Sequence, residues 1–403
     1  MNTELSIPRD GRMRGLELQT RSALESQEGH QGHQSQEDQT SLHAPMTPIL
    51  RRAVDRHASD IHLVVGLPPM LRIDGELIAG EGMPLGREDA RSLVYSLLTE
   101  GQIGEFEKDW QLCVSLFLPD VGHFRVTVYY HMSSVEASIR VCPLSLRSPK
   151  ELGLPDIVGK LVERRSGLIL ITGPTGSGKT TTFNCLLDMI NRQRRCKIIT
   201  VEDPVEYVHE NRLSLIVQQQ VHSDTRSFSQ ALVHILRQDP DVIGVGEMRD
   251  LETISTALTA AETGHLVIAT LHTPDAAQTV DRIVDAFPGD QQPQVLTQLA
   301  SCLQAIVAQQ LLPRVDCEGR KLATEVLVGT QAVRNQIRER KSNLLRSTIQ
   351  TSRADGMQAM DKSLLDLYQQ GIITYETAVA HAHSPDYIKE AAGTDAKRGT
   401  SHI

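Results

Sequence analysis

The spacing of apolar and polar residues divides the chain into five segments. Residues 1–45 are polar and have no apolar periodicity, so we predict a disordered extension there. Residues 46–145 mix short alternating stretches with amphipathic helical ones, which is typical of a small α+β domain. Residues 146–153 contain Ser and Pro and form the expected linker. Residues 154–390 alternate apolar strands with helices, and residues 391–403 form an expected disordered tail.

Within the N-terminal domain, the pattern predicts a helix, two short strands, a second helix and then three longer strands. The predicted helices span 49–57 and 87–98, and the predicted strands span 61–65, 71–75, 113–118, 124–130 and 135–141. In the strand 124–130, alternate side chains share a face. One face carries Phe124, Val126, Val128 and Tyr130, and the other carries Arg125, Thr127 and Tyr129.

The larger segment predicts a parallel α/β sheet whose strands are joined by crossover helices. Its predicted strands span 168–172, 197–202, 241–246 and 265–270, and its predicted helices lie near 180–192, 227–237 and 251–263. A helical segment follows from about residue 330 to residue 383, with helices at 332–340 and 361–369.

Composition limits the classes of function. The 403 residues are 40% hydrophobic, enough for a sizeable core, and the net charge is −9. The acidic charge and the aromatic content of only 3% argue against a nucleic acid as the main partner. The six cysteines form no CxxC pair, which favours reduced thiols in a cytosolic protein without structural zinc.

Two further observations concern membranes and metals. No apolar run approaches the ~18 residues of a membrane span, so we expect no direct membrane insertion and any membrane association through a partner protein. His30, His33 and His43 could bind a metal, but the composition favours a solvated tail.

A glycine-rich motif between a predicted strand and a predicted helix indicates a phosphate-binding loop. Its residues are Gly173, Pro174, Thr175, Gly176, Ser177, Gly178, Lys179, Thr180 and Thr181. The backbone N–H groups of such a loop point at phosphate, Lys179 can reach the β- and γ-phosphates of ATP, and the Thr180 hydroxyl can hold Mg²⁺. The alternative is a glycine-rich turn without a ligand, which the full GxxxxGK[ST] pattern in this context disfavours.

Acidic residues follow two of the predicted strands, where ligands bind in open α/β sheets. Glu202, Asp203 and Glu206 crowd at the end of the strand 197–202, and spacing alone does not decide which of them is the general base. Glu247 follows the strand 241–246 directly, in the Walker B position, and is the expected Mg²⁺ ligand.

Three other polar residues near these strands have alternative interpretations. Asp250 and Glu252 lie at a helix start, where both could serve only as capping residues. His272 follows the strand 265–270. Alone it would be a structural histidine, but beside a P-loop we interpret it as a sensor of the γ-phosphate.

These motifs resemble those of the secretion and pilus motor ATPase family over residues 46–390. The loop resembles the family's Walker A box, and the remaining matches are the Asp box at 200–207, the Walker B box at 241–250, the His box at 259–273 and the start of a PAS-like domain at 58–72. Within the family, the helix at 332–339 is similar to the AIRNLIRE signature of the PilT-type pilus retraction ATPases.

The resemblance implies a RecA-like P-loop ATPase domain with a smaller PAS-like N-terminal domain and a C-terminal helical segment. It implies a Mg²⁺-dependent ATPase that forms a homohexamer, acts in the cytoplasm on an inner-membrane platform protein and powers retraction of type IV pili in twitching motility. It assigns Glu206 as the general base and Glu247 as the Walker B acid. It assigns Arg125 and Arg140 to the phosphates of a neighbouring subunit, although without the family both would be ordinary surface residues.

The chain also departs from the family at positions outside the nucleotide motifs. Val333 and Gln336 replace an isoleucine and a leucine of the signature, and the glutamine places a polar group at an apolar position. Gln218-Gln-Gln220 replaces a more charged stretch. We expect this departure to affect subunit contacts rather than nucleotide chemistry.

The alternatives to a retraction motor are an accessory retraction paralogue, a pilus extension or type II secretion ATPase, a RecA-like nucleic-acid translocase, and a nucleotide-dependent scaffold with negligible turnover.

Overall fold

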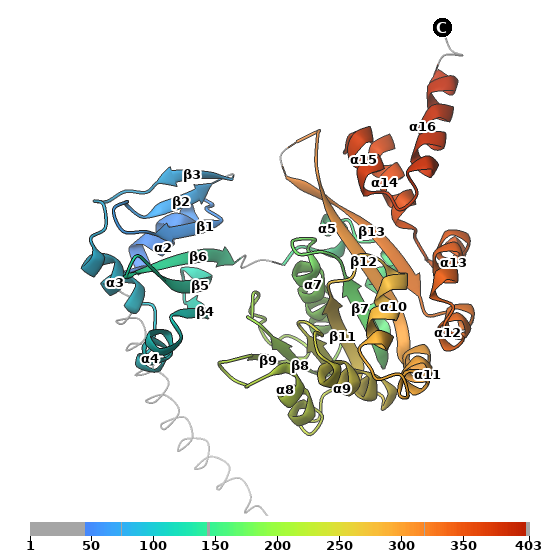
Figure 1. Cartoon of the computed structure of the whole chain (residues 1–403), viewed down its shortest axis with the longest axis horizontal. Coiled ribbons are helices and arrows are strands. Elements are labelled where there is room, and N and C mark those ends of the chain that lie inside the picture. The colour runs from blue at the N-terminus through green and yellow to red at the C-terminus, as the bar shows by residue number, and fades with distance from the viewer. Residues whose placement is uncertain (1–44, 74, 143–145, 318, 400–403) are drawn as a thin grey trace, which may run out of the picture. The chain divides into compact units, whose positions relative to one another are not determined.

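The computed structural model of the chain describes residues 45–73, 75–142, 146–317 and 319–399. The chain divides into two compact units, Met1–Cys142 and Pro143–Ile403 (Figure 1). The predicted disordered extension, apart from residue 45, and the three histidines within it lie outside the described residues. Within the described ranges, no helix combines the length and the apolar character needed to cross a membrane.

The described residues of the first unit form an antiparallel sheet with strand order β3-β2-β1-β6-β5-β4 and three helices. Its elements are α2 (Thr47–Asp55), β1 (Asp60–Leu63), β2 (Met70–Ile73), β3 (Glu76–Ala79), α3 (Arg87–Tyr95), α4 (Glu100–Asp109), β4 (Gln111–Leu118), β5 (Gly122–His131) and β6 (Ser134–Cys142). The sequence does not predict β3, because all four of its residues are exposed and show no alternation. It also does not predict α4, whose start depends on a capping box between Thr99 and Gln102.

Strand β5, which lies between β6 and the edge strand β4, separates a buried face from a polar one, as its alternation predicts. Phe124, Val126 and Val128 are fully buried in the core of the first unit. Arg125 and Thr127, which point to the other face, remain partly exposed. The polar face of β5 is therefore available for contacts outside the core.

The second unit is built on a seven-stranded sheet with strand order β13-β12-β7-β11-β10-β8-β9 (Figure 1). All neighbouring strands are parallel except β13, which is antiparallel to β12. Its strands are β7 (Gly167–Thr172), β8 (Lys197–Glu202), β9 (Leu215–Gln220), β10 (Val242–Val245), β11 (Leu266–Leu271), β12 (Leu303–Pro313) and β13 (Arg320–Val328).

The helices of the second unit follow the predicted alternation with strands and then form the C-terminal segment. They are α5 (Pro149–Leu152), α6 (Asp156–Lys160), η1 (Leu161–Glu163), α7 (Lys179–Gln193), α8 (Phe228–Ile235), α9 (Leu251–Glu262), α10 (Ala276–Asp285), α11 (Gln292–Cys302), α12 (Gln331–Arg338), η2 (Ser342–Leu344), α13 (Leu345–Thr351), η3 (Arg353–Asp355), α14 (Met360–Gln369), α15 (Tyr375–His381) and α16 (Pro385–Gly399). The expected fold class, an α/β domain with a smaller α+β unit and C-terminal helices, is confirmed.

Two hydrophobic cores cover the two faces of this sheet. Leu168 and Leu170 of β7 face a core that includes residues of α8 to α13. Ile169 and Ile171 face the opposite core, which includes residues of α6, η1 and α7. Because both faces are buried, the strands are continuous apolar runs rather than alternating ones. This burial places β7, which leads into the glycine loop, in the interior of the unit.

Several elements have no counterpart among the predicted ones. Strand β9 is the parallel edge strand beside β8, and its sequence ends in three glutamines, which hide its strand character. Residues 274–330 contain α10, α11 and the hairpin β12–β13. The expected linker includes the short helix α5, which begins at a capping box of Ser148 and Glu151. Helix α16 extends to Gly399, past the start of the expected disordered tail at residue 391.

The signature helix α12 contacts α13 through the residue that departs from the family pattern. The side-chain amide of Gln336 donates to Oγ1 of Thr348 at 2.9 Å, and the Thr348 hydroxyl lies 3.1 Å from Oε1 of Gln336. Both residues are partly buried. Val333 and Ile337, on the same helix, are fully buried in the core. Thr348 therefore satisfies the polar group at position 336.

Replacing Thr348 with Val is expected to destabilise the protein by about 1 kcal/mol, because the partly buried amide of Gln336 loses its partner. The double variant Gln336→Leu/Thr348→Val pairs two apolar groups and should recover most of this loss. The measurement is the free energy of unfolding in urea. Thr351→Val, an exposed position on the same helix, controls for the effect of valine on helix stability. A double variant as unstable as Thr348→Val would contradict the compensation.

Candidate functional site

The glycine loop joins the buried strand β7 to helix α7. Gly173, Gly176 and Gly178 have φ angles of 141°, 79° and 89°, which side chains with a Cβ rarely adopt. A Cβ at Gly173 would lie 2.4 Å from the carbonyl oxygen of Gln309 on β12, so this position also has no room for a side chain. The loop therefore turns tightly against the sheet and leads into the N-terminus of α7, where backbone N–H groups favour an anion.

Lys179 is folded back over this loop. Its Nζ donates hydrogen bonds to the carbonyl oxygens of Gly173 at 2.9 Å and Pro174 at 3.0 Å, and the residue is only 8% exposed. Burial lowers the pKa of Lys179, and the Glu247 carboxylate opposes this change. The Ser177 side chain buries a hydroxyl oxygen that has no hydrogen-bond partner in the structure. An ammonium group and an unpaired hydroxyl inside the loop suit a phosphate ligand.

The carboxylate of Glu247 is the centre of a polar cluster at the carboxyl edge of the sheet. Strand β10 ends two residues before Glu247, and the adjacent β11 ends directly before His272. One carboxylate oxygen of Glu247 lies 3.2 Å from Nε2 of His272, and the other lies 2.7 Å from the guanidinium of Arg249. Nδ1 of His272 lies 3.5 Å from Oγ1 of Thr175 in the glycine loop. The structure thus brings two predicted site residues together with the loop.

The surroundings of Glu247 keep it ionised. Burial raises the pKa of this carboxyl, but the hydrogen bond from Arg249 and the charges of His272, Arg249 and Lys179 lower it more strongly. The net result is a pKa below the usual value. A carboxylate held in its charged form can act as a metal ligand or as an acceptor for a protonated group.

Glu202 and Glu206, both near the end of β8, have different environments. Glu202 is 2% exposed, and one of its oxygens accepts hydrogen bonds from Thr200 at 2.7 Å and from Gln218 at 3.1 Å. Burial raises the pKa of Glu202 to about 7, although the hydrogen bonds oppose this effect. Glu206 lies in the following loop and is partly exposed. The geometry therefore favours Glu206 over Glu202 as the acid that meets a ligand.

The loop that carries Glu206 is attached to the edge strand β9 and to helix α7. Oε1 of Gln220 accepts a hydrogen bond from the backbone of Val205 at 3.2 Å, and the amide of Gln218 donates to the carbonyl of Tyr207 at 2.8 Å. The hydroxyl of Tyr207 lies 3.3 Å from that of Thr181 on α7. The two glutamines therefore hold the loop of the candidate base, contrary to the expectation that they act only away from the nucleotide chemistry.

Asp250 is a helix cap rather than part of the polar cluster. It accepts hydrogen bonds from the backbone N–H and the hydroxyl of Thr253 at 2.8 and 2.7 Å, so it forms the N-cap of α9. Glu252 is exposed in the first turn of the same helix. The capping interpretation of Asp250 is confirmed.

Arg125 and Arg140 lie side by side in the first unit. They are directly opposite each other on β5 and β6 and therefore share a face of the sheet. Nε of Arg125 donates to the sulfur of Cys113 at 3.4 Å, and Nε of Arg140 pairs with Asp60 at 3.0 Å. The Arg140 side chain is 65% exposed. The structure thus places the two arginine side chains on one face of the first unit, with Arg140 in an ion pair with Asp60.

A hollow of about 600 Å³ adjoins the glycine loop. Its lining includes Arg147, Gly178, Thr181, Tyr207, Arg314 and Arg320. The guanidinium of Arg320 on β13 also donates to the carbonyl of Gly176 in the loop at 3.3 Å. A nucleotide whose phosphates bind at the loop would have room for its sugar and base in this hollow.

Thr180 and Glu247 carry the predicted oxygen ligands for Mg²⁺. A hydroxyl and an ionised carboxylate are hard donors, which Mg²⁺ prefers. No cluster of three or more His, Cys, Asp or Glu side chains suited to a metal occurs in the described part of the chain. Because Thr180 and Glu247 would supply only two oxygen ligands, an ion held by them would take its remaining ligands from phosphate and water, as Mg²⁺ commonly does.

Sequence reasoning misses three residues that support this site, one near Glu247 in the chain and two far from it. Arg249 could have been found, because it follows Glu247 by two residues and can pair with it. Gln218 and Gln220 carry no such local signal, because their contact with the loop exists only once β9 pairs with β8.

Replacing Glu202 with Gln is expected to reduce the dependence of stability on pH. The folded protein keeps the Glu202 proton up to pH about 7, whereas the ordinary pKa is 4.5. Folding therefore binds a proton in this interval, and the free energy of unfolding falls as the pH rises through it. Glu202→Gln should become more stable relative to the wild type by up to about 3 kcal/mol above pH 7.

Urea unfolding between roughly pH 5 and pH 8 measures this difference. Glu210→Gln, an exposed glutamate in the loop after β8, is the matched control and should follow the wild type at every pH. A constant difference between Glu202→Gln and the wild type would show that Glu202 titrates normally.

Known proteins match both the sequence and the structure of the chain. The family described as Type II/IV secretion system protein matches residues 144–394. The type IV pilus retraction ATPase PilT of Pseudomonas aeruginosa is 42% identical over 341 residues, which cover 85% of this chain and 99% of that protein. The type IV pilus ATPase PilU of the same organism is 36% identical over 355 residues, which cover 88% of this chain and 93% of that protein.

A solved structure supports the same relationship. The crystal structure of the pilus retraction motor PilT with bound ADP has a TM-score of 0.81 and 45% sequence identity to this chain. The match covers 86% of this chain and 99% of the other. The chain therefore belongs to the family of Type II/IV secretion system proteins and, within that family, to its PilT-type members.

Proposed function

We propose that this chain is an ATPase that powers the retraction of type IV pili. The observation that carries the proposal is the meeting of three segments at one edge of the sheet: the glycine loop with Lys179, the pair of Glu247 and His272, and the loop with Glu206. PilT, which is 42% identical over nearly its whole length, is named as a retraction ATPase. ATP hydrolysis that drives pilus retraction is the function that this arrangement supports best.

In the proposed reaction, the chain holds ATP by its phosphates and activates a water molecule. Lys179 exchanges its contacts with the loop carbonyls for contacts with phosphate oxygens. Glu206 accepts a proton from the water as its oxygen bonds to the γ-phosphorus, and the bond from that phosphorus to the β–γ bridging oxygen breaks. His272 detects the γ-phosphate, because it bridges Glu247 and Thr175 of the loop.

The Thr180 hydroxyl and the Glu247 carboxylate would hold Mg²⁺, which supplies charge neutralisation at the phosphates when it is bound. The hollow beside the loop accommodates the sugar and base of the nucleotide. The crystal structure of PilT contains bound ADP, which supports the proposal that the present chain also binds a nucleotide.

The proposed machine is a homohexameric ring that acts on an inner-membrane platform protein of the pilus. Arg125 and Arg140 of one subunit reach the phosphates of the nucleotide in the next. Their position side by side on one face supports this role, because two guanidinium groups can contact several phosphate oxygens. Hydrolysis would then depend on ring assembly.

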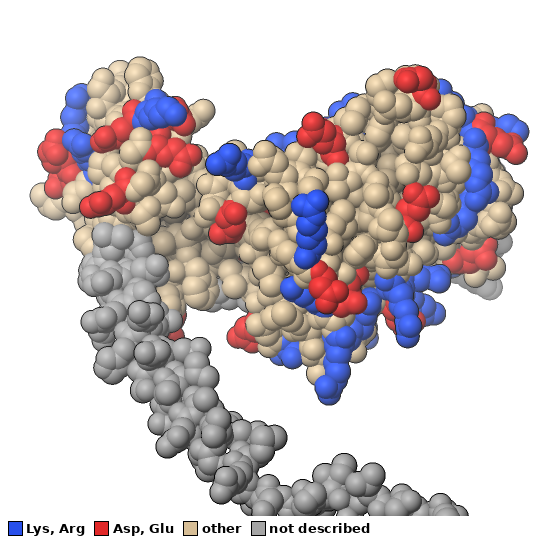
Figure 2. Space-filling model, turned by 90° about the horizontal axis from the view of Figure 1, so that it is seen from below, with Lys and Arg blue, Asp and Glu red and all other residues tan. Residues whose placement is uncertain are grey.

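Among the alternatives, a role as another type IV pilus ATPase is supported by the 36% identity to PilU, which is named as a type IV pilus ATPase. A nucleic-acid translocase is disfavoured by a net charge of −9. On the part of each unit that Figure 2 shows, Lys and Arg side chains lie among Asp and Glu side chains.

Replacing Glu206 with Gln is expected to lower ATP turnover by roughly 10²- to 10⁴-fold, because a general base is lost. Nucleotide affinity should stay the same, since the glycine loop is unchanged. Phosphate release by the purified protein and calorimetric titration with ADP measure the two quantities. Glu210→Gln, in the same loop region, should hydrolyse ATP at the wild-type rate. If Glu206→Gln hydrolyses ATP as fast as the wild type, Glu206 is not the general base.

The cellular test uses a strain that lacks this gene. Excess surface pili and lost twitching, restored by the wild type but not by Glu206→Gln, are the expected outcome. Bald cells would instead indicate pilus extension. Unchanged pili would indicate an accessory paralogue or a different machine.

Mixing two inactive variants tests the action of the arginines between subunits. Arg125→Ala and Glu206→Gln should each be nearly inactive alone. In mixed rings, a site with an intact Glu206 can receive Arg125 from a neighbour, so turnover should recover to at most about a quarter of the wild-type rate. A mixture no more active than the sum of its parts would show that Arg125 does not act on a neighbouring site.

A further inference from the structure

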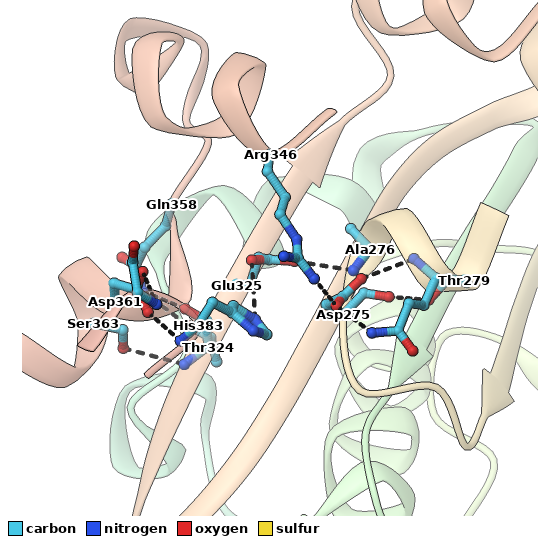
Figure 3. A network of polar contacts seen from close by, with 12 residues as sticks. Asp275, Ala276, Thr279, Thr324, Glu325, Arg346, Gln358, Asp361, Ser363 and His383 are labelled. Atoms are coloured by element: carbon cyan, nitrogen blue, oxygen red, sulfur yellow. Dashed lines mark hydrogen bonds and ion pairs between the residues drawn. The ribbon is translucent and has the colours of Figure 1, made fainter. Parts of the chain in front are cut away.

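The N-terminus of helix α10 gathers two buried acids that face an arginine and a histidine from the C-terminal segment (Figure 3). Asp275 is fully buried, and Glu325 on β13 is 3% exposed. Arg346 of α13 pairs with Asp275, and Nε2 of His383 lies 3.7 Å from Glu325. None of these residues belongs to the nucleotide motifs, but Asp275 follows His272 by only three residues.

Asp275 joins a helix cap to an ion pair. Its Oδ1 accepts the backbone N–H of Gln278 at 2.8 Å, which caps α10. Its Oδ2 accepts the side-chain amide of Gln278 and the guanidinium of Arg346, each at 2.8 Å. Because a buried carboxylate without a partner is costly, the pair with Arg346 holds Asp275 and the start of α10 in one position.

Glu325 fixes the same helix terminus from the sheet. One of its oxygens accepts the backbone N–H of Ala276, the first residue of α10, at 2.9 Å. Two carboxylates, from Glu325 on β13 and from the N-cap residue Asp275, therefore accept backbone N–H groups in the first turn of α10. The N-terminus of α10 has little freedom to move unless its partners move with it.

The loop between β11 and α10 is too short to isolate His272 from this anchor. Only Thr273 and Pro274 separate His272 from Asp275. The Thr273 hydroxyl lies 2.7 Å from that of Thr279, and the Thr279 hydroxyl donates to the carbonyl of Asp275 at 2.6 Å. A displacement of Asp275 therefore displaces the His272 backbone.

We propose that Arg346 is a positioning residue for ATP hydrolysis. Through its ion pair with Asp275 it holds the loop that places His272 against Glu247, and it thereby links the nucleotide site to helix α13. This inference rests on the proposed ATPase function. The link continues to α12, because Thr348 of α13 is hydrogen-bonded to Gln336 of α12. A change at the γ-phosphate thus reaches the C-terminal helices through a chain of direct contacts.

The test compares variants that remove the pair of the half-exposed Arg346 with the buried Asp275 and a variant that removes a pair whose two members are exposed. Arg346→Gln alone leaves a buried charge on Asp275 and can impair folding. The double variant Asp275→Asn/Arg346→Gln removes both charges, and Asn remains a good helix cap. The control is Arg340→Gln, which breaks an exposed pair with Asp285 at the other end of α10.

The double variant is expected to lower kcat roughly ten- to a hundredfold, since a small misplacement of a catalytic group has effects of this size. ADP affinity should not change, because His272 acts at the γ-phosphate. In a His272→Ala background, the same two substitutions should cause no further loss of kcat, because the imidazole that Asp275 and Arg346 position is already absent. Arg340→Gln should match the wild type in both backgrounds. Wild-type kcat in the double variant, or a loss that adds in full to that of His272→Ala, would overturn the inference.

Amide hydrogen exchange separates this inference from the proposed function. Exchange in residues 272–279 should be faster in the double variant than in Arg340→Gln, whether or not ATP is hydrolysed. A wild-type protein without ATP turnover would refute the proposed function alone. Equal exchange in the two variants would refute the positioning role of Arg346, even if the wild type is an active ATPase.

Discussion

The alignment of parallel strand ends at one edge of the sheet is the constraint on which the site depends. Thr172 at the end of β7 is in register with Leu271 of β11. Val245 of β10 is in register with residues of both β11 and β8. The residues that follow each strand therefore emerge at one edge, although they are separated by up to about a hundred positions in the chain. The glycine loop, Glu247 and His272 meet there for this reason.

The burial of ionisable side chains is the second constraint, and it explains why so many supporting contacts surround this edge. Lys179, Glu202 and Asp275 are all at least nine-tenths buried. Each is stabilised by specific partners: loop carbonyls for the lysine, Thr200 and Gln218 for the glutamate, and Arg346 and Gln278 for the aspartate. Removing a partner would leave a charge or a polar group buried without compensation. The same contacts that satisfy these groups also fix the loops that carry the chemistry.

Local signals predict the parts of the fold that depend on local physics. The apolar strands β7, β8, β10 and β11 and the helices between them follow from periodicity, and the glycine loop follows from its own spacing. Strand β9 is not predicted, because its glutamines are polar and only its pairing with β8 makes it a strand. The hairpin β12–β13 is also not predicted, although Gln309 of β12 contacts both Gly173 and Thr182 of the P-loop region. These elements complete the site from distant parts of the chain.

The sequence by itself determined the fold class, the phosphate loop and the short set of acids and histidine from which the site is built. It did so because glycine spacing, apolar periodicity and the order of strands are properties of neighbouring residues. Only the tertiary structure decided that Glu202 is enclosed while Glu206 is partly exposed, and that Gln336 has a partner in Thr348. It alone placed Arg346 on the buried Asp275. Burial and pairing between distant residues arise from the packing of whole elements, which no local pattern encodes.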